Sequence, residues 1–89
     1  MRGHIDIPAD LLDAVRAAMP EHVHLSRCEP GCLRFDLHES PDTPGRLLVD
    51  EAFADRAAFE AHQARAGASA WGRLTLGIPR HFTIEDTPA

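Results

Sequence analysis

Glu51 and His62 have the residue types and the spacing to move a proton between neighbouring elements. The segment that joins them reads Glu-Ala-Phe-Ala-Asp-Arg-Ala-Ala-Phe-Glu-Ala-His. We interpret it as a strand end, a cap at Asp55 and a helix, which directs both side chains toward apolar surroundings. Because burying an unpaired ionisable group is unfavourable, the two are either paired for structure or used for chemistry. His62 is the candidate base, since a free imidazole titrates near neutral pH.

Each candidate also has a structural interpretation that stays open at this point. Burial should raise the pKa of Glu51 unless one of the nine arginines forms a salt bridge with it. His62 could be a hydrogen-bonded core residue. Trp71, the only tryptophan, could wall a pocket for a flat aromatic ligand or plug the domain edge. Glu29 and Arg27 flank Cys28, where local pairing or capping is favoured over an oxyanion contact.

Metal, nucleotide and nicotinamide chemistry receive no support from the sequence. Cys28 and Cys32 are spaced C-x3-C, unlike a redox or zinc C-x-x-C pair, and the six histidines lack H-E-x-x-H spacing. No Walker, Rossmann or G-x-S-x-G motif is present. We therefore expect no metal site and no bound cofactor.

Composition predicts one small domain over residues 1–89. The net charge of −5 argues against a nucleic-acid partner. No apolar run is long enough to span a membrane, and the N-terminal residues lack the apolar stretch of a signal peptide. These features predict a cytoplasmic protein.

Residue periodicity predicts four strands and two main helices. In order, they are a strand over 3–7, a helix over 9–28, strands over 32–39 and 46–53, a helix over 55–66, and a strand over 80–85 after a short helical turn over 68–73. The first helix should bury Leu12, Val15, Met19 and Val23, and Pro20 should kink or restart it. Leu33 and Ile84 should point inward from their strands.

The order β-α-β-β-α-β predicts a ferredoxin-like α+β domain, with a four-stranded antiparallel sheet and helices on one face. So short a chain has no further element to cover the second face. We therefore expect a homodimer with the sheets face to face. His4 and His81 should lie opposite their apolar neighbours, at the surface or in a dimer contact.

Two segments resemble the antibiotic biosynthesis monooxygenase family, which includes quinol monooxygenases. They are Glu-Pro-Gly-Cys-Leu-Arg-Phe over 29–35 and Glu-x-Phe-x-Asp-x-x-Ala-Phe-x-x-His over 51–62. The resemblance implies a dimeric α+β barrel with a pocket between sheet and helices in each subunit. Characterised relatives oxidise anthrones or quinols with molecular oxygen and need no flavin, metal or haem.

Carried onto this chain, the resemblance makes His62 the base or anion stabiliser. Glu51 becomes the group that orients and tunes it. Trp71 becomes a stacking wall, and Phe35, Phe53 and Phe59 are the other expected substrate contacts. The chain departs from some catalytic relatives in having no tyrosine.

The resulting expectation is a cofactor-independent monooxygenase that oxidises a small aromatic, such as a quinol, an anthrone or a polyketide-like phenol, with molecular oxygen. The main alternative is a non-catalytic dimeric barrel that binds a small hydrophobic ligand. Haem binding, with His62 or His81 as axial ligand, and an isomerase acting on a phosphorylated or dicarbonyl substrate are further alternatives. Fold analogy contributes to all four.

Overall fold

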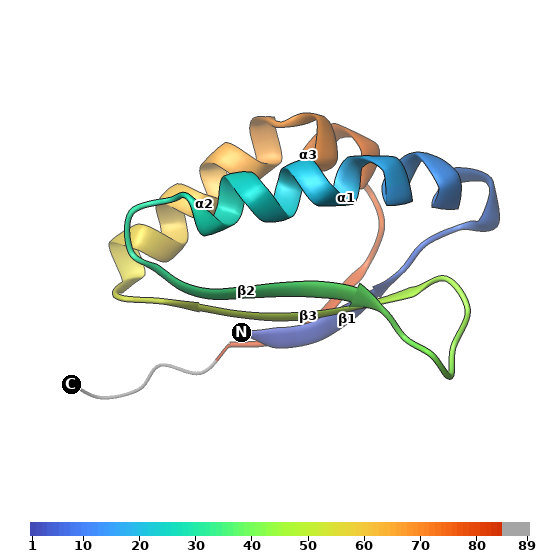
Figure 1. The fold of residues 1–89 in the computed structure, drawn as a ribbon, viewed down its shortest axis with the longest axis horizontal. Coiled ribbons are helices and arrows are strands. Elements are labelled where there is room, and N and C mark those ends of the chain that lie inside the picture. Colours follow the sequence, from blue (N-terminus) through green and yellow to red (C-terminus); the bar gives the residue numbers. More distant parts are fainter. Residues whose placement is uncertain (85–89) are drawn as a thin grey trace.

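The computed structural model describes residues 1–84 and contains four strands and three α-helices (Figure 1). The elements run β1 (Arg2–Asp6), the 3-10 turn η1 (Ala9–Leu11), α1 (Leu12–Arg27), β2 (Cys32–Glu39), β3 (Arg46–Phe53), α2 (Arg56–Ala68), α3 (Ala70–Leu74) and β4 (Arg80–Thr83). The predicted strands over 32–39 and 46–53 are confirmed, because clean alternation of apolar and polar residues defines them locally.

The sheet order is β2-β3-β1-β4, and every pair of neighbouring strands is antiparallel. All three helices cover one face of this sheet (Figure 1). The predicted ferredoxin-like α+β architecture is therefore confirmed. Leu47, Val49 and Glu51 lie on the helix-facing side of β3, at the centre of the covered face.

The first helix differs from its prediction in two respects. It continues through Pro20 as one helix, so the restart that was one of the two expected effects of this proline does not occur. Pro20 lies on the exposed side, where its missing N–H removes one ladder hydrogen bond and leaves the buried face intact. The buried face also differs, because His22 and Ser26 follow Val15 inward while Val23 is only half-buried.

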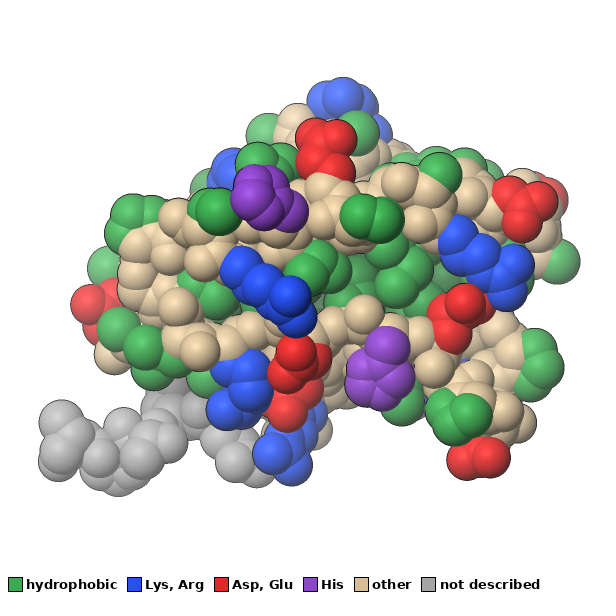
Figure 2. Space-filling view, in the orientation of Figure 1, with side chains coloured by type: hydrophobic (Ala, Val, Ile, Leu, Met, Phe, Trp, Pro, Cys, Tyr) green, Lys and Arg blue, Asp and Glu red, His purple; other side chains and the backbone are tan. Residues whose placement is uncertain are grey.

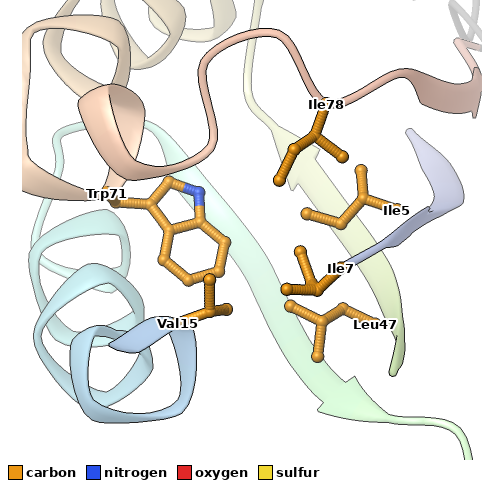
Figure 3. Packing of buried hydrophobic residues seen from close by; sticks show 6 residues of the cluster. All are labelled: Ile5, Ile7, Val15, Leu47, Trp71 and Ile78. Atoms are coloured by element: carbon orange, nitrogen blue, oxygen red, sulfur yellow. The ribbon is translucent and has the colours of Figure 1, made fainter. Parts of the chain in front are cut away.

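The apolar core lies between the helix layer and the sheet (Figure 3). Its buried members are Ile5, Ile7, Val15, Leu47, Trp71 and Ile78. In Figure 3 the indole of Trp71 extends from α3 beside Val15 of α1 and faces the aliphatic side chains of the sheet. Trp71 thus joins the two layers at the end of the domain where α3 packs.

Two inward predictions near the strand ends are wrong. Leu33 is 69% exposed because the β2–β3 register shifts between Cys32 and Arg34, which turns Leu33 out of the row that contains Phe35. Ile84 is 53% exposed, since β4 ends at Thr83. The predicted last residue of that strand, Glu85, lies outside the described residues.

The outer face of the sheet is rich in charge and imidazole. Arg46 pairs with Asp6, and Asp50 lies between Arg2 and Arg34. His4 stacks on His81, with ring centroids 4.8 Å apart, on the side opposite Ile5, as the alternation predicts. Figure 2 also shows cationic and anionic side chains in contact on the side of the molecule that it displays. Arg16 pairs with Glu39, and Arg27 pairs with Asp36.

Candidate active site

His62 lies on the buried side of α2, at the place where this helix crosses the end of the sheet. The helix begins after Asp55, whose carboxylate accepts a hydrogen bond from Ala58 N at 2.8 Å, so the predicted cap is confirmed. The imidazole is 3% exposed and packs against Phe53 and Phe35, with ring centroids 4.9 and 5.4 Å away. The helix therefore presents a polar side chain to largely aromatic surroundings.

Glu51 meets His62 from the sheet. Its side chain is 3% exposed, and its Oε2 lies 3.9 Å from His62 Nε2. Its Oε1 is buried without a hydrogen-bond partner. Burial raises the pKa of Glu51, and the opposing effect of His62 is smaller. Within residues 1–84 no arginine forms an ion pair with Glu51, so the salt-bridge alternative is not what the structure contains.

A second carboxylate reaches His62 from the turn that follows α1. Glu29 Oε1 lies 2.6 Å from His62 Nδ1 and also accepts a hydrogen bond from Arg65 Nη2 at 3.0 Å. Burial opposes ionisation of Glu29, but the hydrogen bonds from His62 and Arg65 outweigh it and lower the pKa of this carboxyl. The sequence interpretation limited Glu29 to local contacts. Its contact with His62 on α2, 33 positions further along the chain, depends on the tertiary fold.

His22 is the functional candidate that the sequence interpretation missed. It is 6% exposed, and its ring lies parallel to the indole of Trp71, with centroids 4.6 Å apart and planes 5° apart. Burial, reinforced by the charges of His62 and Arg65, lowers the pKa of His22 to about 4, so this imidazole is neutral at pH 7. The sequence pattern that could have predicted its burial is its position seven residues after Val15, which places both side chains on the same helix face.

His22, Glu51 and His62 border a cavity of about 290 Å³ between the sheet and the helices. Its walls are mainly apolar, with Phe35, Val49 and Trp71 among them, and its polar lining includes Glu51, His62 and His22. Arg80 also lines the cavity, while its guanidinium donates to Thr75 O, Thr75 Oγ1 and Ile78 O. A concave, mainly apolar space with a few convergent polar groups is typical of a small-molecule site.

The four predicted substrate contacts separate into two places. Trp71 and Phe35 line the cavity with the two candidate catalytic residues. Phe53 and Phe59 pack on each other, with centroids 5.9 Å apart, and line a neighbouring hollow of about 710 Å³. Glu51 borders both spaces. Phe53 thus contacts the His62 ring without lining the cavity that His62 borders.

Neither a metal cluster nor a spanning helix occurs in the part of the chain that the structure describes. No group of three or more His, Cys, Asp or Glu side chains within residues 1–84 could hold a metal ion. Cys28 and Cys32 are free thiols, and Cys28 Sγ lies 3.8 Å from His24 Nε2 on the exposed side of α1. The helices between residues 1 and 84 are too short or too polar to cross a bilayer.

The fold and the buried His–Glu site together define a small ferredoxin-like α+β protein with a pocket between its sheet and its helices. The family model for antibiotic biosynthesis monooxygenases matches residues 1–74. The chain therefore belongs to the antibiotic biosynthesis monooxygenase family.

Solved structures show the same similarity. A candidate antibiotic biosynthesis monooxygenase from Nitrosomonas europaea is 28% identical, with a TM-score of 0.78 over 90% of this chain and 87% of that one. A second, from Bacteroides thetaiotaomicron, is 27% identical, with a TM-score of 0.79 over 98% and 85%. No functionally curated protein shows significant sequence similarity to this chain.

Proposed function

We propose that this protein is a cofactor-independent monooxygenase that oxidises a small phenol or quinol with molecular oxygen, with His62 as the base. The observation that carries the proposal is the His62–Glu51 pair inside the apolar cavity. Both side chains are 97% buried, yet both border a space large enough for a ligand. The alternative in which His62 is packed with no adjacent cavity is not supported.

The distance between the two residues suits a shared ligand atom. At 3.9 Å, His62 Nε2 and Glu51 Oε2 are too far apart to hydrogen-bond directly. A hydroxyl oxygen about 2.7 Å from each atom would form a triangle with them. A phenol could then give its proton to Nε2 while Glu51 contacts the same oxygen.

The raised pKa of Glu51 favours this arrangement. A carboxyl group that binds its proton more tightly than usual carries less negative charge beside a newly formed phenolate. In its protonated form it can also donate a hydrogen bond to that anion. The surrounding apolar walls strengthen both effects by lowering the local dielectric constant.

The proposed reaction converts one ring C–H to C=O. Proton transfer to His62 leaves a phenolate, which gives one electron to O₂ to form a substrate radical and superoxide. Their recombination forms a C–O bond and, with the proton returned from His62, a hydroperoxide. Loss of the hydrogen on that carbon as a proton, with cleavage of the O–O bond, yields the quinone and one water. The substrate supplies all the electrons, so the residues only move protons and stabilise charge.

Cavity size limits the substrate to a small aromatic. The cavity of about 290 Å³ is roughly twice the ~150 Å³ of an engineered apolar cavity that binds benzene. One- and two-ring phenols and hydroquinones are therefore the first compounds to test, ahead of three-ring anthrones.

The test is oxygen uptake by the purified, chelator-treated protein with benzene and naphthalene hydroquinones and with anthrone, using ¹⁸O₂ to label the product. Uptake above autoxidation, with one ¹⁸O atom in the product, should require intact protein and fall at least 100-fold in His62→Ala. His24→Ala, at an exposed position on α1, is the matched control and should retain activity. Ligand binding with no uptake would reject the proposal and favour the non-catalytic ligand-binding barrel.

A further inference from the structure

We propose that Glu29 is a positioning residue for His62: it fixes the imidazole with Nδ1 protonated and turns the lone pair of Nε2 toward Glu51 and the cavity. The consequence for turnover rests on the proposed function, whereas the tautomer itself does not. The family resemblance implied that Glu51 orients His62. The distances assign it to Glu29, because 2.6 Å is a hydrogen bond and 3.9 Å is not.

The direction of the hydrogen bond follows from the chemistry of its acceptor. Glu29 Oε1 receives Arg65 Nη2 at 3.0 Å in addition to His62 Nδ1, and these two contacts favour the ionised carboxylate. An ionised carboxylate has no hydrogen to donate, so Nδ1 must carry the proton. In a neutral imidazole the only remaining lone pair is then on Nε2.

The partner of Glu29 is itself held in place. Arg65 Nη2 also donates to Ser26 Oγ at 3.1 Å, and Ser26 Oγ donates to His22 O at 2.7 Å on α1. Arg65 therefore bridges α1, the turn that carries Glu29, and α2. Glu29 is 14% exposed at its side chain, so little water competes for its carboxylate.

The turn that carries Glu29 is docked on the helix that carries His62. Glu29 N donates to Ser26 O at 3.2 Å, and Cys32 N donates to Glu29 O at 3.1 Å. Gly31 adopts a positive φ of 84°, and a Cβ at that position would come within 2.7 Å of Ala58 Cβ on α2. The Glu-Pro-Gly turn thus approaches α2 as closely as glycine allows, which sets the distance from Glu29 to His62.

A positioned base differs from a free one in tautomer and in orientation. Without the Glu29 contact, the neutral ring can place its proton on Nε2, which would turn a hydrogen-bond donor toward the cavity and remove the base. Rotation of the ring by 180° about χ2 would place ring C–H groups where Nδ1 and Nε2 now lie. Nε2 would then no longer face Glu51 and the cavity. The same logic explains why an aspartate that fixes a catalytic histidine matters to serine hydrolases without accepting the proton itself.

The test measures the tautomer directly by ¹⁵N NMR of the histidine side chains, with the His62 signals assigned by their loss in His62→Ala. With the His62 ring in its neutral form, the wild-type spectrum should show a protonated Nδ1 and an unprotonated Nε2. Glu29→Gln, which keeps an oxygen acceptor, should retain this pattern. Glu29→Met, which has similar length and no oxygen, should give a mixture of tautomers.

Activity supplies the second readout. Glu29→Met should lower kcat by about 10- to 100-fold with little change in KM, because the cavity walls are unaltered, and Glu29→Gln should recover a large part of that loss. Glu60→Met, at an exposed position on α2, is the matched control and should change neither tautomer nor kcat.

Failure of this inference is distinguishable from failure of the proposed function. A protonated Nε2 in the wild-type protein, or an unchanged tautomer in folded Glu29→Met, overturns the positioning role. If the tautomers behave as expected but the wild-type protein consumes no oxygen, the positioning role holds and the monooxygenase proposal is rejected.

Discussion

His22 lies flat against Trp71, with the two ring planes only 5° apart, so the imidazole covers one face of the only indole in the chain. Trp71 is also a member of the apolar core and a wall of the cavity. The stack therefore links the stability of the helix layer to the shape of the pocket. Because one member of the stack is titratable, this link should be sensitive to pH.

Replacement of His22 by Phe should make the protein less sensitive to acid. The pKa of His22 is about 4 in the folded state and about 6.5 in the unfolded state, so only the unfolded state binds the proton between these values. Its contribution to stability is complete above pH 6.5 and is lost as pH falls toward 4. Between pH 7 and 4.5, the wild-type free energy of unfolding should fall by about 2 kcal/mol more than that of His22→Phe.

Urea unfolding followed by circular dichroism at equal protein concentrations measures this difference. Glu29, whose pKa is lowered, also loses its contribution in acid, but it is present in both proteins and cancels in the comparison. If the free energy of unfolding changed with pH equally in the wild type and in His22→Phe, His22 would not be a buried neutral imidazole. The pH profile of His24→Phe, at an exposed position on α1, should match that of the wild type.

Replacement of Glu51 by Gln should have the opposite pH signature. Burial raises the pKa of Glu51 above 4.5, so the folded state holds the proton more tightly than the unfolded state. Wild-type stability should therefore fall as pH rises from 4.5 through the raised pKa. Glu51→Gln removes this dependence, and it should gain stability relative to the wild type on going from pH 4 to pH 8.

Asp50 provides a control on the same strand. It lies on the outer face, where the hydrogen bond from Arg34 lowers its pKa. Asp50→Asn should therefore lose stability relative to the wild type as pH rises, the reverse of Glu51→Gln. Equal pH dependence in the two variants would show that Glu51 is not in a desolvated site.

Filling the cavity should abolish ligand binding. Trp71 is the only tryptophan and the chain has no tyrosine, so intrinsic fluorescence reports on the cavity wall. We expect 1,4-naphthoquinone to quench this fluorescence saturably. Ala66→Phe, which projects into the cavity from α2, should weaken the binding at least tenfold, or by about 1.4 kcal/mol.

Ala61→Phe is the matched control, because Ala61 is exposed on the same helix. It should bind the quinone as the wild type does. Similar quenching by all three proteins would place the quinone outside this cavity.

The bare face of the sheet predicts a homodimer. No element of residues 1–84 covers this face, and the half-buried Leu48 lies at its centre, between His4 on β1 and His38 on β2. Sedimentation should give a mass of twice 9.8 kDa, and Leu48→Asp should shift it toward the monomer. A monomeric wild type at micromolar concentration would contradict the prediction.

Local patterns in the sequence predicted the parts of this protein that depend on near neighbours. The alternation over 32–39 and 46–53 defined the hairpin, and the Asp55 cap defined the start of α2. The same spacing placed His62 on a buried helix face and Glu51 on a buried strand face, as observed. Period and capping determine these features because each involves residues within a few positions of one another.

Tertiary packing decided which groups surround His62. The family resemblance implied that Glu51 is the carboxylate that orients it, whereas the hydrogen bond comes from Glu29. It also placed Val23 on the buried stripe of α1, where the structure buries His22. Both outcomes depend on the rotation of α1 about its axis and on how its terminal turn docks against α2. These are set by the fit of whole faces across the core, which spacing along one helix does not specify.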